Sequence, residues 1–243
     1  MAESPSDYEA DILADCQQAI GYTFRELGLL RSALTHTSGA NTRLASFERL
    51  EFLGDAVLGL VCVELLYRQF PEYQEGDMTK VKSAVVSRVA CAQFSQEIGL
   101  GEFLFVGRGM RPSGDLPSNL LADVFESVVG AIYLDGGMDA AQPFIVRYLD
   151  PEVDRVVRDA ANNNYKSLLQ QVAQREHGDT PRYQVLDEQG PDHHRSFKIA
   201  VLVGGQRFPA AWGPNKKVAE SRAAQNALAA MQGTSIPFDL DPE

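Results

Sequence analysis

Three carboxylates interrupt one apolar stretch of the chain, ERLEFLGDAVLG from Glu48 to Gly59. Glu48, Glu51 and Asp55 are spaced i, i+3 and i+7, so on a helix they share one face opposite an apolar stripe. Like charges at this spacing repel one another by about 0.2–0.5 kcal/mol per pair. The stretch indicates either a solvated helix face or a site for a hard divalent cation, and Phe52 and Gly59 on the acidic side favour the cation.

A second stretch, NLLADVFESVVGAIYLDGG, repeats this pattern far along the chain. Asp123 and Glu126 are spaced i and i+3, opposite another apolar arc, and Gly130 follows Glu126 by four residues just as Gly59 follows Asp55. A glycine one turn along an acidic face permits the close approach of a second helix or of a ligand. One acidic helix of this kind is usually structural, but two in the same chain indicate a shared metal site.

The donor atoms of this predicted site are all carboxylate oxygens. Glu51, Asp55, Asp123 and Glu126 come without a His or Cys ligand, so the set suits Mg²⁺, for which Mn²⁺ can substitute. Sites of this kind typically carry out phosphoryl transfer, in which the cation polarises the phosphate and acidifies an attacking water.

Both acidic stretches lie in a part of the chain with helical periodicity. Turn residues separate the apolar repeats, which predicts helices over residues 11–20, 25–34, 47–69, 76–99, 119–134 and 140–158. The run DAANNN near residues 160–164 is the predicted linker. We therefore expect an all-α catalytic domain over residues 8–160.

Beyond the linker the periodicity changes. A helix, three strands with alternating apolar residues and a last helix are predicted over residues 165–177, 182–187, 195–203, 206–212 and 215–231. Gly204 and Gly205 make a two-residue turn between the second and third strands. This order predicts a small α+β (α-β-β-β-α) domain over residues 163–232, followed by an acidic tail over residues 233–243.

Charge is unevenly distributed along the 243 residues. The net charge is −11, but residues 163–232 carry 9 Lys and Arg against 6 Asp and Glu, which suits a nucleic-acid partner.

The acidic N-terminus lacks a signal-peptide core, and no run reaches the roughly 18 apolar residues of a membrane span. Cys16, Cys62 and Cys91 lie in apolar contexts without CxxC spacing, which indicates reduced thiols in a cytoplasmic protein.

These residues carry a resemblance to a known family. ERLEFLGDAVLG resembles the signature of ribonuclease III, and LADVFESVVGAIYLDGG resembles the second acidic segment of that family. ALTHTSGAN and GDMTKVKSAVVS resemble two further family stretches in the expected order, so the resemblance covers nearly the whole chain. It implies an endoribonuclease that hydrolyses double-stranded RNA with a divalent metal and leaves 5′-phosphate and 3′-hydroxyl ends.

The resemblance also implies a role for each carboxylate of the predicted site. Glu51, Asp123 and Glu126 match metal ligands of the family. Asp55 and Glu126 match the residues most directly tied to catalysis.

Two neighbouring positions match auxiliary roles. Glu48 matches an acidic position closer to RNA contact or dimer support, and Phe52 matches a residue that packs into the partner subunit of a homodimer. The chain departs from the family pattern at Phe47, at Lys82 and in the loop over residues 107–118. None of these positions is one of the four carboxylates, so the loop bears on substrate preference and not on activity.

The segment GPNKKVAESRAAQNAL opens the last predicted helix with two lysines. Lys216 and Lys217 fall in its first turn, where the helix macrodipole disfavours cations, so they are either solvated side chains or a phosphate clamp. The small-residue face of this helix and the three strands before it resemble a double-stranded RNA-binding domain. The resemblance implies RNA contacts at the opening helix around Lys166, at the loop GPDHH with His193 and at the lysine pair, spanning about 16 bp of A-form duplex.

We interpret the chain as a cytoplasmic, homodimeric endoribonuclease with no membrane partner, whose expected substrates are ribosomal RNA precursors and structured mRNA. The alternative is a catalytically silent double-stranded RNA-binding or ribosome-associated protein, which the four intact carboxylates disfavour. A metal-dependent phosphohydrolase of small molecules is disfavoured by the basic second domain.

Overall fold

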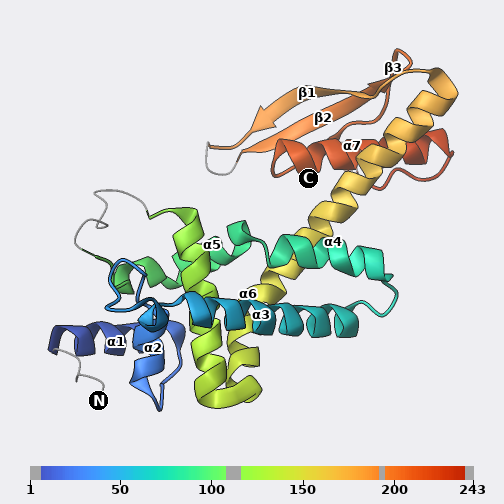
Figure 1. Ribbon diagram of the computed structural model, residues 1–243. Helices are drawn as coiled ribbons and strands as arrows, with labels where there is room; N and C mark the ends of the chain where they lie inside the picture. Colours follow the sequence, from blue (N-terminus) through green and yellow to red (C-terminus); the bar gives the residue numbers. More distant parts are fainter. Residues whose placement is uncertain (1–6, 108–115, 192–194, 239–243) are drawn as a thin grey trace. The chain divides into compact units, whose positions relative to one another are not determined.

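The computed structural model describes residues 7–107, 116–191 and 195–238, and the chain forms two compact units, 1–156 and 157–243 (Figure 1). The first unit is helical, and the second combines helices with an antiparallel sheet. The predicted fold class, an all-α domain followed by a small α-β-β-β-α domain, is confirmed. Within the described ranges, no helix has the length and apolar character that crossing a membrane requires.

The first unit is built on helices that the apolar periodicity largely predicts. They are α1 (Asp7–Ile20), α2 (Leu27–Ala33), α3 (Glu48–Gln69), α4 (Glu75–Val85), α5 (Arg88–Ile98) and the first part of α6 (Ser118–His177), with 3-10 helices η1 (Arg43–Ala45) and η2 (Leu100–Phe103). Helix α6 continues into the second unit, so the run DAANNN, predicted as a linker, is helical. Its Ala and Asn residues do not stop a helix as Gly or Pro would.

The single helix predicted over residues 76–99 is two helices, α4 and α5. Ser87 separates them with an extended backbone (φ −70°, ψ 155°), and its Oγ accepts a hydrogen bond from the Ala90 N–H at 3.3 Å, which caps α5. A further break in periodicity, at Gly137, is a kink inside α6, where the backbone adopts φ 71° and ψ −168°. The cap at Ser87 makes Arg88 the first residue of α5.

An aromatic cluster fixes α5 against α6 in the core of the first unit. The rings of Phe94, Phe125, Phe144 and Tyr148 pack with centroids 5.3–5.9 Å apart. Aromatic pairs at these separations contribute about 0.5–1.5 kcal/mol each beyond their burial. Because Phe125 precedes Glu126, this cluster also fixes the acidic face of α6.

The sheet of the second unit follows the predicted strand order with one interruption. Its strands are β1 (Arg182–Gln189), β2 (Ser196–Val203), β3 (Gln206–Arg207) and β4 (Ala211–Gly213). Strand β2 pairs antiparallel with β1 on one side and with both β3 and β4 on the other, so β3 and β4 replace the single strand predicted over residues 206–212. Pro209 lies between them and has no N–H to offer the ladder.

Helix α7 (Lys216–Met231) and the end of α6 cover one face of this sheet (Figure 1). The predicted small-residue face of α7 is confirmed, since four alanines on it are fully buried: Ala219, Ala223, Ala224 and Ala227. The last two of these alanines pack in one apolar cluster with Leu169 of α6, Val201 of β2 and Phe208, and the first two pack with Ile199 in a second cluster. The close packing of α7 on the sheet fixes where Lys216 and Lys217 begin the helix.

Candidate metal centre and RNA-binding surface

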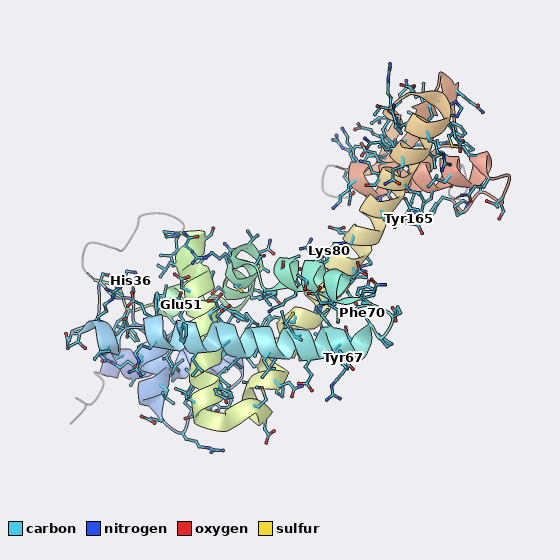
Figure 2. The ribbon with its side chains drawn as sticks, turned by 45° about the vertical axis from the view of Figure 1, so that its right-hand side comes forward. His36, Glu51, Tyr67, Phe70, Lys80 and Tyr165 are labelled. Atoms are coloured by element: carbon cyan, nitrogen blue, oxygen red, sulfur yellow. The ribbon has the colours of Figure 1, made fainter. Side chains whose placement is uncertain are left out.

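Helices α3 and α6 touch backbone to backbone at two glycines. A Cβ added to Gly54 would lie 1.7 Å from the Glu126 carbonyl oxygen, and one added to Gly130 would lie 2.3 Å from the Leu50 carbonyl oxygen. Only glycines permit helices to approach this closely. The crossing brings the acidic faces of the two helices together, and Glu51 lies where α3 passes α6 (Figure 2).

The sequence identifies only one of the two glycines at this crossing. Gly130 makes the predicted close approach, but its partner is Gly54 and not Gly59. A Cβ at Gly59 would meet only the end of the Lys82 side chain, at 3.9 Å. The contact with α6 therefore lies at the border between the apolar and acidic faces of α3, and Asp55 remains exposed.

The pKa values show that the charges of the predicted carboxylates act on Glu51 and on Glu126. Burial raises the pKa of Glu126 to about 7, with further contributions from the charges of Asp55, Glu51 and Asp123. Burial also raises the pKa of Glu51, with the charge of Asp123 next in effect, and burial raises the pKa of Asp123. The site holds more negative charge than its surroundings neutralise, which is the condition that a bound cation relieves.

Glu48 stands apart from this cluster. Arg43 donates two hydrogen bonds to it, from Nε to Oε2 at 2.8 Å and from Nη2 to Oε1 at 3.1 Å. The hydrogen bonds from Arg43 hold the pKa of Glu48 below its ordinary value. The auxiliary role of Glu48 stays a prediction, and its charge is already paired.

Three residues that the sequence did not assign to this site border the cluster. The charge of Arg88 lowers the pKa values of Glu51, Asp123 and Glu126, although burial raises each of them more. His36 has the same effect on Asp123, and the buried Cys91 thiol hydrogen-bonds to Glu126. All three come from segments other than the acidic helices, so helical periodicity carries no signal for them, and only the tertiary structure shows which carboxylates they approach.

The donor set fits a hard divalent cation. Among the described residues, no group of three or more His, Cys, Asp or Glu side chains is already gathered into a coordination shell. Mutual repulsion of ionised carboxylates works against such gathering until a cation neutralises it. Four carboxylates and a surplus of negative charge match Mg²⁺ or Mn²⁺, and Glu51, Asp123 and Glu126 are the residues that would hold the cation.

The raised pKa of Glu126 predicts a pH-dependent stability for the metal-free protein. The folded-state pKa of about 7 lies above the ordinary value of 4.5, so folding favours the protonated carboxyl. Its contribution to stability is complete below about pH 4.5 and is lost as the pH rises through about 7. We expect the urea midpoint measured in EDTA to fall across this window, and to fall less in Glu126→Gln; equal falls in both proteins would contradict the assignment.

An exposed aromatic residue and a pocket share one surface of the first unit. Phe52 of α3 is 83% exposed, although large apolar side chains usually avoid water. It borders a pocket of about 690 Å³ whose apolar lining includes Leu44, Leu53 and Leu134. Leu44 and Leu134 are themselves more than half exposed. A protruding ring beside an apolar pocket is an arrangement that a two-fold symmetric, self-complementary contact can use.

The predicted RNA-contacting lysines of the second unit all have acidic partners. Lys166 pairs with Glu220, and its Nζ lies 4.9 Å from the centroid of the Tyr183 ring. Lys217 Nζ lies 3.1 Å from Asp159.

Lys216 Nζ lies 4.0 Å from Glu188 and 5.2 Å from the centroid of the Phe197 ring. Both Lys216 and Lys217 fall in the first turn of α7, whose N-cap Asn215 accepts a hydrogen bond from the Val218 N–H at 2.9 Å. His193 and residues 108–115 of the predicted loop lie outside the described residues.

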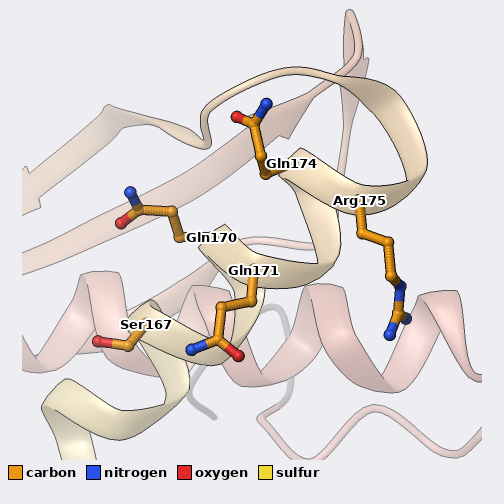
Figure 3. A pocket seen from close by; sticks show the side chains of 5 residues that line it. All are labelled: Ser167, Gln170, Gln171, Gln174 and Arg175. Carbon is orange, nitrogen blue, oxygen red and sulfur yellow. The ribbon is translucent and has the colours of Figure 1, made fainter.

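The end of α6 carries a further polar surface near Lys166. A pocket of about 550 Å³ is lined by Ser167, Gln170, Gln171, Gln174 and Arg175 (Figure 3). Amide side chains both donate and accept hydrogen bonds, so this surface can bind hydrogen-bond donors as well as acceptors. The sequence indicated this helix, around residues 166–174, as an RNA contact.

Comparison with known proteins identifies both units. Residues 26–152 match the family described as Ribonuclease-III-like, and residues 165–231 match the double-stranded RNA binding motif. A protein named Ribonuclease 3 from Rhodopirellula baltica is 51% identical over 226 residues, which cover 93% of this chain and 85% of the relative. The chain belongs to the ribonuclease III family. It is an endoribonuclease of that type, and the predicted resemblance is confirmed.

Further relatives support this assignment. Ribonuclease 3 of Symbiobacterium thermophilum is 44% identical, over 88% of this chain and 92% of the relative. A solved structure of the nuclease domain of ribonuclease III from Campylobacter jejuni is 33% identical and superposes with a TM-score of 0.54, covering 58% of this chain and 97% of that domain. That domain is described as structurally flexible in a region involved in dimer formation.

Proposed function

We propose that the enzyme hydrolyses phosphodiester bonds of double-stranded RNA with a divalent metal bound at the α3–α6 crossing. The observation that carries the proposal is the convergence of four mutually repelling carboxylates on two helices that meet at Gly54 and Gly130. The same chain carries a double-stranded RNA binding motif, which would bring the substrate to that site.

Glu51, Asp123 and Glu126 are proposed to hold Mg²⁺, with Mn²⁺ as a substitute, and Asp55 and Glu126 to be most directly tied to the chemistry. When bound, the cation would supply polarisation of the phosphate and a more acidic attacking water. Attack of the water oxygen on phosphorus, with departure of the 3′ oxygen, gives the proposed 5′-phosphate and 3′-hydroxyl ends. Glu126 is half-buried, so bulk water screens its charge less than that of an exposed carboxylate.

The proposal is tested by incubating the protein with a long duplex RNA and with each of its single strands, in Mg²⁺ or in EDTA. We expect cleavage of the duplex only, and only in Mg²⁺, with ends that are substrates for a 3′-hydroxyl-dependent ligation. Binding of duplex without cleavage under all metal conditions would instead support the catalytically silent alternative.

We propose that two copies of the chain associate through the surface around Phe52. An exposed ring beside the pocket lined by Leu44 and Leu134 supports a symmetric contact, and the related nuclease domain from Campylobacter jejuni has a region involved in dimer formation. Each copy would then contribute both its Phe52 ring and its pocket to the contact.

Phe52→Ala is expected to raise the dimer dissociation constant by about 100-fold, since buried aromatic anchors contribute most of the energy of such contacts. Sedimentation velocity over a range of concentrations measures the change. Tyr67→Ala is the matched control, because Tyr67 is also an aromatic residue of α3 and is 72% exposed. Equal association of the Phe52 variant and wild type would place the dimer contact elsewhere.

We also propose that Lys216 and Lys217 bind phosphates of the duplex, which would take the places of the carboxylates of Glu188 and Asp159. Replacing both lysines with Ala is expected to weaken binding equally for all sequences and to lower the slope of log K against log salt by about 1 for each phosphate no longer neutralised. Arg68→Ala with Lys80→Ala removes two exposed charges from the first unit as a control. An unchanged salt slope in the lysine variant would show that other residues of the motif bind the RNA.

Ribosomal RNA precursors and structured mRNA are the proposed substrates in the cell, because both contain long duplex segments. A cytoplasmic location is proposed because Cys16, Cys62 and Cys91 are all buried and form no disulfide, which suits a reducing compartment.

A further inference from the structure

Arg88 lies on the face of α5 that packs against the acidic helix. Arg88, Cys91 and Ser95 are spaced i, i+3 and i+7, so they share this face. Ser95 Oγ donates a hydrogen bond to the Leu121 carbonyl oxygen of α6 at 2.5 Å, and the Cys91 thiol hydrogen-bonds to Glu126. Arg88 continues the face by one turn, beside the carboxylates.

The charge of Arg88 reaches carboxylates of both acidic helices without pairing with any of them. It attracts Glu51 of α3 as well as Asp123 and Glu126 of α6. Within the part of the chain that the structure describes, its guanidinium forms no hydrogen bond or ion pair. By contrast, Arg43, Arg68 and Arg155 of the same unit each pair with a glutamate.

Local helix stability does not account for this arginine. Arg88 is the first residue of α5, where the helix macrodipole disfavours a cation, and the first turn contains no acidic residue to offset the cost. The side chain is exposed, so burial of its aliphatic part does not hold it there either. In the metal-free protein, the charges that Arg88 attracts are the carboxylates of Glu51, Asp123 and Glu126.

The phosphate of a bound substrate would bring a further anion to this place. Once a divalent cation neutralises the carboxylates, Arg88 no longer has a protein anion to attract, and a phosphodiester is the anion that reaches the site. A planar guanidinium donates two parallel hydrogen bonds to phosphate oxygens, which Lys cannot do. We propose that Arg88 binds the non-bridging oxygens of the scissile phosphate, an inference that rests on the proposed function.

The test measures single-turnover cleavage of a defined RNA duplex at saturating Mg²⁺ and saturating enzyme. Arg88→Ala is expected to lower the rate about 100-fold, with the duplex dissociation constant and the Mg²⁺ concentration for half-maximal rate both within about 3-fold of wild type. Arg88→Lys should retain an intermediate rate, and added guanidinium ion should partly restore Arg88→Ala. Arg68→Ala, which removes an exposed guanidinium near the end of α3, is the control.

A wild-type rate in Arg88→Ala would overturn the inference, and so would a loss that higher Mg²⁺ fully restores, because Arg88 would then act on metal binding. Arg88→Gln repeats the test if the alanine variant shows a lowered thermal midpoint. Failure of the wild-type protein to cleave duplex RNA would instead refute the proposed function and is distinguishable from a failure of this inference.

Discussion

Glu126→Gln is expected to abolish duplex cleavage, with a rate lowered by on the order of 10³-fold or more, while duplex binding stays unchanged. Loss of one preorganised electrostatic group typically costs 10²–10³-fold, and Glu126 is proposed both to hold the metal and to act in catalysis. The substitution keeps the shape of the side chain and removes its charge from a position where burial raises the carboxyl pKa to about 7. Single-turnover cleavage and a filter-binding assay measure the two quantities separately.

The matched control is Glu72→Gln, which removes one negative charge from an exposed position of the same unit. It should cleave at the wild-type rate. Near-wild-type cleavage by Glu126→Gln at saturating Mg²⁺ would remove Glu126 from the site. A loss of duplex binding equal to the loss of cleavage would show that the carboxylate serves binding instead.

Gly54→Ala is expected to separate the two acidic helices. The added methyl group would lie 1.7 Å from the Glu126 carbonyl oxygen, a backbone atom that cannot move without shifting α6. Overpacking of this kind costs about 1–3 kcal/mol and occasionally more, and we expect the free energy of unfolding to fall by at least about 3 kcal/mol. Cleavage by the remaining folded protein should fall as well, because Glu51 and Asp55 move away from Asp123 and Glu126.

Gly59→Ala on the same helix is the control for this substitution. Its methyl group would meet only the flexible end of Lys82 at 3.9 Å, and Ala is a better helix former than Gly by about 0.5–1 kcal/mol. Urea unfolding should therefore show Gly59→Ala to be as stable as wild type or more stable. If Gly54→Ala matches wild type in stability and cleavage, the two helices do not form the site by close contact at this glycine.

The sequence was sufficient to predict the acidic faces but not how they meet. Spacing along a helix determines that Glu51 and Asp55 share one face, and the same rule applies to Asp123 and Glu126. Which glycine forms the crossing depends on the packing of two helices far apart in sequence. Gly59 matched the spacing of Gly130 better than Gly54 did, and only the structure shows that Gly54 makes the contact.

Residues from outside the two acidic helices could not be predicted from periodicity. The sequence predicted one continuous helix over residues 76–99, with Arg88 in its interior. The cap at Ser87 instead makes Arg88 the first residue of α5. In the second unit, Pro209 explains the divided third strand. The ion pairs of the lysines were also missed, because Glu188 and Asp159 are 28 and 58 residues away from Lys216 and Lys217.

The most direct test of the metal site is the anomalous diffraction of crystals soaked in Mn²⁺. We expect a Mn²⁺ peak at the α3–α6 crossing, within about 2.0–2.3 Å of carboxylate oxygens of Glu51, Asp123 and Glu126, and its loss in Glu126→Gln. A peak bound only by other residues, or no peak at a Mn²⁺ concentration that supports cleavage, would contradict a catalytic metal site at this crossing.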